Sequence, residues 1–126
     1  MKFRDLVPPL ELCKKIPAGE FKDSAFNWFS NNYFGGWNVE RRQMTYFFTD
    51  NGELYPAPTL QEILEELHKL QEDVFLKWSE TAYNEWLVDA YTHNVNNHQA
   101  HDKNPATAAL KVWLELKGIK NEHRKI

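Results

Sequence analysis

Large aromatic side chains crowd three short segments of this chain, at positions that would alternate between the two faces of a β-strand. Aromatic residues favour strands, and successive strand side chains point to opposite faces. In each segment one phenylalanine lies on the face opposite the other large apolar residues, namely Phe29, Phe47 and Phe75. A sheet covered on one side cannot bury all of them, so helices on both faces or a partner chain must cover the second face. The segments are residues 24–30, 42–49 and 73–79.

Two helices have clear boundary signals. The first is expected over residues 60–70, because Thr59 is a favourable N-cap and Glu62, three residues later, completes a capping box. Its apolar residues recur every three or four positions, as in an amphipathic helix: Leu60, Ile63, Leu64, Leu67 and Leu70. The second is expected over residues 105–117, where Asn104 can cap the helix and Pro105 suits its first position.

Turn signals divide the rest of the chain. Residues 31–38 are expected to be a turn-rich link, and Asp50-Asn51-Gly52 a turn before a short hairpin arm at 53–55. Residues 94–104 are expected to be a polar loop. We expect helices at 9–17, 60–70 and 105–117, and strands at 24–30, 42–49, 73–79 and 83–92.

The order of these elements, α-β-β-α-β-β-α, predicts an α+β fold. The expected architecture is an antiparallel four- to five-stranded sheet with helices packed mainly on one face. The last two strands are expected to form a hairpin. Trp78, Ala82 and Trp86 are also spaced as on one side of a helix, so a helix is the alternative there.

Length and composition predict one globular domain over residues 1–126, with 118–126 as a frayed tail. The formal charge is −3 and the hydrophobic fraction 42%, which excludes disordered and collagen-like chains and argues against a dedicated duplex-DNA binder. The single cysteine, Cys13, is expected to be a small buried apolar residue. No apolar segment approaches the length of a membrane span and no signal segment is recognisable, so we expect a soluble cytoplasmic protein.

The strongest metal-like grouping is His93, His98 and His101, followed by Asp102. Imidazole and carboxylate groups are plausible Zn²⁺ ligands, and a metal-dependent enzyme using the three histidines is one alternative function. The spacing matches no motif of known geometry, however, and a solvated histidine-rich loop is the favoured interpretation. No cofactor is therefore expected.

Other catalytic patterns are weak. The carboxylate pairs Glu65-Glu66 and Glu80/Glu85 are expected on solvated faces rather than in a cleft. The chain contains no nucleophile elbow, no P-loop and no dinucleotide-binding glycine motif. Gly35-Gly36 is interpreted as a turn or bulge. The absence of these motifs favours a non-enzymatic function without excluding an enzyme.

Arg41 and Arg42 suggest a second alternative, single-stranded nucleic-acid binding. Basic groups beside strand aromatics can hold a phosphate backbone while bases stack on the rings. The aromatic candidates are Phe26, Trp28, Tyr46 and Phe48. The competing interpretation is that these rings form the core face of the sheet, because each alternating strand must bury one side.

Three stretches of the chain form a further pattern: Val7-Pro8-Pro9-Leu10-Glu11-Leu12-Cys13-Lys14-Lys15 with Asp23-Ser24-Ala25-Phe26, Tyr55-Pro56-Ala57-Pro58-Thr59-Leu60-Gln61-Glu62-Ile63-Leu64, and Asn104-Pro105-Ala106-Thr107-Ala108-Ala109-Leu110-Lys111-Val112-Trp113-Leu114. Together they resemble a group of small uncharacterised proteins encoded in prophages and other mobile elements of gut-type bacteria. The resemblance implies the element order above and a phage-associated accessory role. Its motifs concern helix capping and packing, and it implies no activity and no catalytic residues.

The surplus of aromatic residues, the mild acidity and the lack of a catalytic motif favour one function. We expect a non-enzymatic accessory protein of a phage or mobile element that acts through protein–protein contacts, self-association among them. Nucleic-acid binding is less favoured, and no membrane partner is expected.

Overall fold

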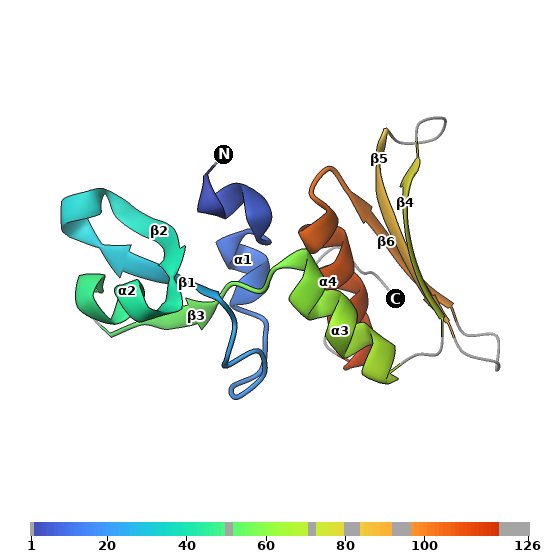
Figure 1. Ribbon diagram of the computed structural model, residues 1–126, viewed down its shortest axis with the longest axis horizontal. Helices are drawn as coiled ribbons and strands as arrows, with labels where there is room; N and C mark the ends of the chain where they lie inside the picture. The colour runs from blue at the N-terminus through green and yellow to red at the C-terminus, as the bar shows by residue number, and fades with distance from the viewer. Residues whose placement is uncertain (1, 50–51, 71–72, 80–83, 92–96, 119–126) are drawn as a thin grey trace. The chain divides into compact units, whose positions relative to one another are not determined.

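The computed structural model describes residues 2–49, 52–70, 73–79, 84–91 and 97–118 (Figure 1). The fold is α+β, and the chain divides into two compact units, Met1–Thr59 and Leu60–Ile126. These are called the N-terminal and C-terminal units below. None of the helices in the described ranges is long and apolar enough to cross a membrane.

The N-terminal unit is built on a three-stranded antiparallel sheet. Its strand order is β2-β1-β3, so that β1 is central and pairs with both neighbours. At the middle of the sheet Trp28 lies between Val39 of β2 and Tyr55 of β3. The strands are β1 (Phe26–Asn31), β2 (Gly36–Arg41) and β3 (Leu54–Pro56).

Helical segments cover both faces of this sheet. On one face lie the 3-10 helix η1 (Phe3–Leu6) and the short helix α1 (Leu10–Cys13), where Phe3 packs on Phe26 with ring centroids 4.9 Å apart. On the same face the indole Nε1 of Trp28 donates a hydrogen bond of 3.1 Å to the Pro8 carbonyl oxygen. On the other face lies α2 (Arg42–Phe48), whose Phe48 ring is 6.0 Å from that of Phe29. Phe29 is thereby buried within one chain.

The strand expected at 42–49 is wrong, because these residues form α2. Alternating Met44, Tyr46 and Phe48 suggested a strand. In the structure Thr45 is fully buried while Met44 and Tyr46 are exposed, which is the spacing of a helix that touches the sheet once per turn. Local propensity is a weak guide in so short a segment, and packing on β1 decides its structure.

The link expected at 31–38 instead contains η2 (Asn32–Phe34) and the first half of β2. Gly35 and Gly36 have φ angles of 88° and 103°, a conformation that favours glycine. They reverse the chain so that Gly36 pairs with Asn31 and β2 runs back along β1. The short arm at 53–55 overlaps β3, which pairs with β1 rather than with residues 42–49.

The C-terminal unit places two helices on one face of a second antiparallel sheet, of order β4-β5-β6 (Figure 1). Val88 and Ala90 in the central strand are fully buried, as are Ile63 and Leu67 from the first helix. The elements are α3 (Leu60–Leu70), β4 (Asp73–Ser79), β5 (Glu85–Tyr91), β6 (Asn97–Asp102) and α4 (Pro105–Leu116).

Several predictions from sequence are confirmed in this unit. Both helices form where expected, and Asn104 caps α4 by accepting hydrogen bonds from the backbone of Ala106 at 2.8 Å and of Thr107 at 3.3 Å. β4 and β5 form the expected antiparallel hairpin, so the helical alternative there is wrong. The expected tail lies almost entirely outside the described residues, which end at Gly118.

The prediction of one four- to five-stranded sheet is wrong, because the strands of the described residues form two three-stranded sheets. In the C-terminal unit the described helices lie on one face of the sheet, whereas in the N-terminal unit helical segments lie on both faces. The polar loop expected at 94–104 contains β6, in which His98 and Ala100 pair with Ala90 and Val88. An edge strand with one solvated face tolerates polar residues at most positions, so its composition resembles that of a loop.

Candidate interaction surface

The three surplus phenylalanines have different environments. Phe29 is 3% exposed and belongs to the core of the N-terminal unit, whereas Phe47 is 81% exposed and Phe75 is 49% exposed. The second strand face is therefore covered at β1 but not at β4, and Phe47 lies on a helix rather than on a strand. The exposed aromatic side chains are the starting point for a functional site.

Asn31 holds together the two elements that carry most of these side chains. Its carboxamide oxygen accepts hydrogen bonds from the backbone N–H groups of Tyr33 at 2.8 Å and Phe34 at 3.2 Å, which caps η2. Its amide nitrogen donates to the carbonyl oxygen of Phe48 at the end of α2. One buried side chain thus fixes η2 and α2 relative to the end of β1.

The aromatic rings above Asn31 form a connected cluster. Phe34 packs edge-on against Phe48, with ring centroids 5.3 Å apart, and against Tyr33 at 5.4 Å. Phe29 lies beneath, 6.4 Å from Phe34. Edge-to-face contacts at these separations are favourable beyond the area they bury. The cluster therefore has a buried base and an exposed top.

Thr45 sets the orientation of α2. Its hydroxyl donates a hydrogen bond of 2.6 Å to the Arg42 carbonyl oxygen and accepts one of 3.2 Å from the amide of Asn27 in β1. Because Thr45 faces the sheet, Met44 and Phe47 project away from it, three positions apart and side by side on the helix. Both are exposed, Phe47 almost completely.

Four exposed side chains, Tyr33, Phe34, Met44 and Phe47, are called the η2–α2 surface below. Tyr33 is 90% exposed and the other three are exposed to differing degrees. Tyr33 and Phe34 were missed from sequence, although their position between Asn32 and the two following glycines is typical of a surface turn. Exposed apolar patches of a few hundred Å² on soluble proteins are often interaction sites.

Most of the residues proposed for nucleic-acid binding contact other side chains of the N-terminal unit, whereas Tyr46 lies on α2 and is 62% exposed. The guanidinium carbon of Arg41 lies 5.7 Å from the centre of the Phe3 ring, and Arg42 is 4.0 Å from the carboxylate of Asp23. Trp28 is buried and Phe26 packs against Phe3. The rings of β1 thus belong to the core of the sheet rather than to a stacking platform.

The proposed metal-binding histidines do not converge. His93 lies outside the described residues. His98 and His101 stand an odd number of positions apart on β6 and so face opposite sides of the sheet. His98 Nδ1 is 3.1 Å from Glu115 of α4, and His101 Nδ1 is 2.8 Å from Glu85 of β5.

Acidic side chains near these histidines also form pairs rather than a ligand set. Asp102 lies 3.3 Å from the ammonium of Lys111 in α4. Among the described residues, no group of three or more His, Cys, Asp or Glu side chains could hold a metal ion. Glu66 pairs with Lys69 at 2.7 Å on α3, and Glu80 lies outside the described residues.

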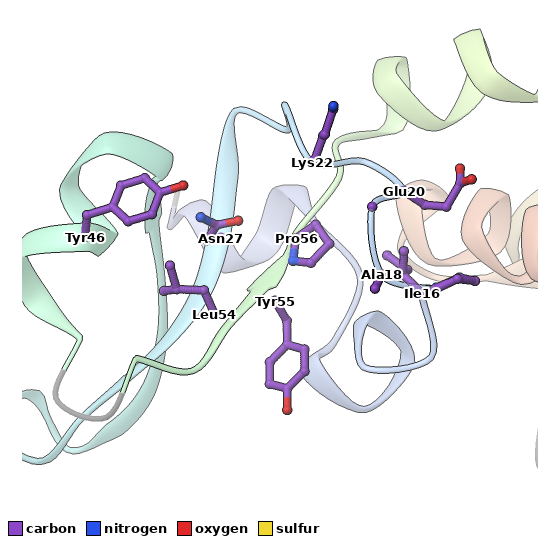
Figure 2. A pocket seen from close by; sticks show the side chains of 11 residues that line it. Ile16, Ala18, Glu20, Lys22, Asn27, Tyr46, Leu54, Tyr55 and Pro56 are labelled. Atoms are coloured by element: carbon purple, nitrogen blue, oxygen red, sulfur yellow. The ribbon is translucent and has the colours of Figure 1, made fainter.

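A shallow cavity of about 350 Å³ lies beside β3 in the N-terminal unit (Figure 2). The Lys22 and Glu20 side chains stand at its rim and point away from its interior, as Figure 2 shows. Asn27, its buried polar group, already donates to Thr45. The Tyr46 hydroxyl points toward Asn27 in Figure 2, so these two polar groups lie on one side of the cavity, whereas small-molecule sites place several polar groups around their ligand.

Cys13 is buried as expected, and its thiol lies 3.5 Å from the Pro8 carbonyl oxygen. Burial raises the pKa of this thiol to about 12, an effect that a hydrogen bond with Trp28 partly offsets. Since the thiolate is the reactive form, Cys13 is not a nucleophile near neutral pH.

A scan against protein-family models, a search of curated proteins and a search of solved structures each found no match to this chain. The resemblance to prophage-encoded proteins therefore remains an expectation from the sequence.

Proposed function

We propose that the protein is a protein-binding module and that the η2–α2 surface is its contact site. The observation that carries this proposal is the exposure of Tyr33 and Phe47, at 90% and 81%, beside a rigid aromatic base. A side chain of this kind contributes about 1.5–3 kcal/mol when it moves from water into an apolar contact. Leaving several exposed on one surface is unfavourable unless a partner covers them.

The size of the η2–α2 surface fits the centre of a protein–protein interface. Large aromatic side chains present roughly 150–250 Å² each, so the four exposed fractions together amount to something on the order of 500 Å². A standard interface buries about 800 Å² per partner, with an apolar centre and a polar rim. Aromatic residues and methionine are the types enriched at such centres.

Preorganisation supports the same function. Asn31 fixes η2 and α2 through three hydrogen bonds, and Phe34 and Phe48 pack edge-on between them. A rigid aromatic surface loses little conformational entropy when it binds, which increases the affinity that a given area provides.

Charge indicates what kind of partner fits. Residues 1–59 contain seven Lys and Arg and seven Asp and Glu, so this unit has no formal net charge to attract a nucleic acid. The four side chains of the surface are themselves uncharged. The partner we propose is a protein with a complementary apolar surface, selected by shape and apolar contact rather than by electrostatic attraction.

The biological setting that we propose is that of an accessory protein of a phage or mobile element. It is supported by the resemblance of the three sequence stretches described above. The contact function does not depend on that setting, because it rests on exposure and geometry alone.

Site-specific photo-crosslinking tests the contact function. A photo-reactive phenylalanine analogue is introduced at Phe47, and at Glu11 as a control on the opposite face of the sheet. In cells that express the protein, we expect a covalent adduct of discrete mass from position 47 and none from position 11. Unlabelled wild type should compete for the adduct, and so should Phe75→Ser. The double variant Tyr33→Ser/Phe47→Ser should not compete. Equal competition by this variant and the wild type, or no discrete adduct, contradicts the proposal.

A further inference from the structure

β4 is an edge strand of the C-terminal sheet and runs without interruption from Asp73 to Ser79. β5 pairs with every residue of β4 along one edge, whereas no strand in the described part of the chain pairs along its other edge. Such an edge presents backbone N–H and C=O groups that can bind a further strand. The side chains of β4 decide which strand fits.

The other strand edges are less suited to pairing. β3 has only three residues and ends at Pro56, which has no backbone N–H to donate. Along β2, the Trp37 carbonyl oxygen already accepts a hydrogen bond of 3.3 Å from Arg4. On the face without helices, β6 presents Gln99 and His101. These two side chains do not form a pair of opposite charges that could fix the register of an added strand.

Side chains of β4 alternate between two distinct faces. Val74 and Leu76 pair with the fully buried Ala90 and Val88, so they lie on the helix-covered face. The residues between and beside them project from the opposite face, called the open face below. They are Asp73, Phe75 and Lys77, all exposed, with Phe75 in the middle at 49%.

We propose that β4 binds β4 of a second copy of the chain in antiparallel orientation, about a two-fold axis at Phe75. In this register Asp73 lies opposite the second copy's Lys77, and Lys77 lies opposite the second copy's Asp73. The two Phe75 rings meet at the axis, and on the helix-covered side Val74 lies opposite the second copy's Leu76. Pairing joins the two three-stranded sheets into one six-stranded sheet, through an interface in which both copies use the same residues.

Side-chain direction limits the possible registers. If the axis passed between two residues, odd positions would pair with even ones, and the helix-covered face of one sheet would adjoin the open face of the other. An axis through Leu76 places Phe75 opposite Lys77 and leaves Asp73 without an opposite charge. An axis through Lys77 places two ammonium groups together, which is unfavourable. Only the axis at Phe75 pairs both opposite charges.

Lysine on an edge strand ordinarily discourages pairing. In β4 the carboxylate of Asp73 stands four residues away on the same face, so that antiparallel pairing of two copies neutralises each lysine. Lys77 thereby favours one register rather than preventing association. The self-association expected from the sequence thus has a defined site, separate from the η2–α2 surface in the other unit.

Sedimentation of the full chain over a range of concentrations tests the inference. Wild type should show a reversible monomer–dimer equilibrium. Asp73→Lys or Lys77→Asp should raise the dimer dissociation constant about tenfold or more, since each dimer contains the affected pair twice. The double variant Asp73→Lys/Lys77→Asp restores opposite charges in the reverse sense and should return the constant to within about threefold of wild type.

Two controls accompany these variants. Lys103→Asp changes the net charge by the same amount as Lys77→Asp at an exposed site outside β4, and it should leave dimerisation unchanged. Tyr33→Ser/Phe47→Ser should also dimerise like wild type, which separates this inference from the proposed function. A wild type that sediments as a monomer at every concentration overturns the inference. So do single charge variants that dimerise like wild type, or a double variant that does not recover.

A cross-linking experiment gives an independent readout should a charge variant fail to fold. Phe75→Cys places two thiols opposite each other at the axis, within reach of a disulfide. Lys77→Cys places the two thiols four positions apart along the strands, about 13 Å, which is beyond that reach. Under mild oxidation we expect a disulfide-linked dimer for Phe75→Cys and not for Lys77→Cys, while Cys13 is buried in both. Equal cross-linking at the two positions contradicts the register.

Discussion

Replacing Phe47 and Phe29 by alanine tests whether the Phe47 ring is exposed to solvent and the Phe29 ring is buried. Phe47 is 81% exposed and Phe29 only 3%. A phenylalanine side chain has roughly 200 Å² of surface, so the fold hides about 40 Å² of Phe47. At about 25 cal/mol per Å², its removal should lower the free energy of unfolding by about 1 kcal/mol. Phe29→Ala removes a whole buried ring and leaves a cavity, so we expect a loss of about 3–5 kcal/mol.

Urea denaturation followed by circular dichroism measures both losses on the same scale. The two substitutions are chemically identical, so the difference between them reports burial rather than residue type. If Phe47→Ala lowered the free energy of unfolding by more than about 2 kcal/mol, its ring would have to be buried. The small area that the fold hides on an exposed side chain cannot account for so large a loss. Similar losses of stability for the two variants would show that Phe47 is not exposed on α2, and would thereby refute the proposed contact site.

Three further substitutions test the local contacts. Thr45→Val removes the hydroxyl that accepts from Asn27, and the buried amide left without it should lower stability by about 1–3 kcal/mol in urea denaturation. Asn104→Ala removes the cap of α4 and should lower stability by about 1 kcal/mol in the same assay. Cys13→Ala should reduce the loss of stability that the protein shows at alkaline pH. The unfolded thiol ionises above about pH 9 while the folded one, with its pKa raised to about 12, stays protonated. Its stabilising contribution is therefore complete below pH 9 and decreases as the pH rises toward 12.

Each substitution has a matched control. Thr49→Val removes a hydroxyl with only a long hydrogen bond of 3.5 Å to Ser30, so it should have a smaller effect than Thr45→Val. Asn104→Ser keeps a capping oxygen and should retain most of the stability. Between pH 8 and pH 10.5 wild type should lose about 2 kcal/mol more than Cys13→Ala. Parallel pH profiles would contradict the burial of an un-ionised thiol.

Sequence predicts the C-terminal unit better than the N-terminal unit, for physical reasons. Asn104 caps α4, Thr59 is of a residue type that favours an N-cap before α3, and α3 carries a continuous apolar stripe, so both helix starts have local signals. β4 and β5 are long enough for alternation to show. β6 escaped prediction because only one of its faces is covered, and the small residue Ala100 suffices opposite the buried Val88.

In the N-terminal unit the elements are short and long-range packing decides them. Residues 42–48 contain residue types that favour strands, yet they form a helix because Thr45 bonds to Asn27 and Phe48 packs on Phe29. No local pattern reports those contacts. Likewise, the sequence indicates a turn at Gly35 and Gly36, but it does not indicate that this turn joins two paired strands.

The candidate sites were only partly predictable. Composition and alternation identified Phe29, Phe47 and Phe75 as a surplus, and two of the three are exposed. Which two could not be derived from sequence, because exposure depends on α2 covering one face of the sheet. The histidines illustrate the opposite case, since proximity in sequence placed His98 and His101 together and the pleat of β6 separates them.

The affinity of the cross-linked partner for purified variants shows whether the η2–α2 surface is the contact site. Isothermal titration of that partner into wild type, Tyr33→Ser/Phe47→Ser and Phe75→Ser gives three dissociation constants under the same conditions. Interface centres built on aromatic side chains lose about 2 kcal/mol or more per residue when these are truncated. We therefore predict a dissociation constant at least about thirtyfold higher for the double variant and an unchanged one for Phe75→Ser. Equal constants for the wild type and the double variant would contradict the assignment of the η2–α2 surface as the contact site.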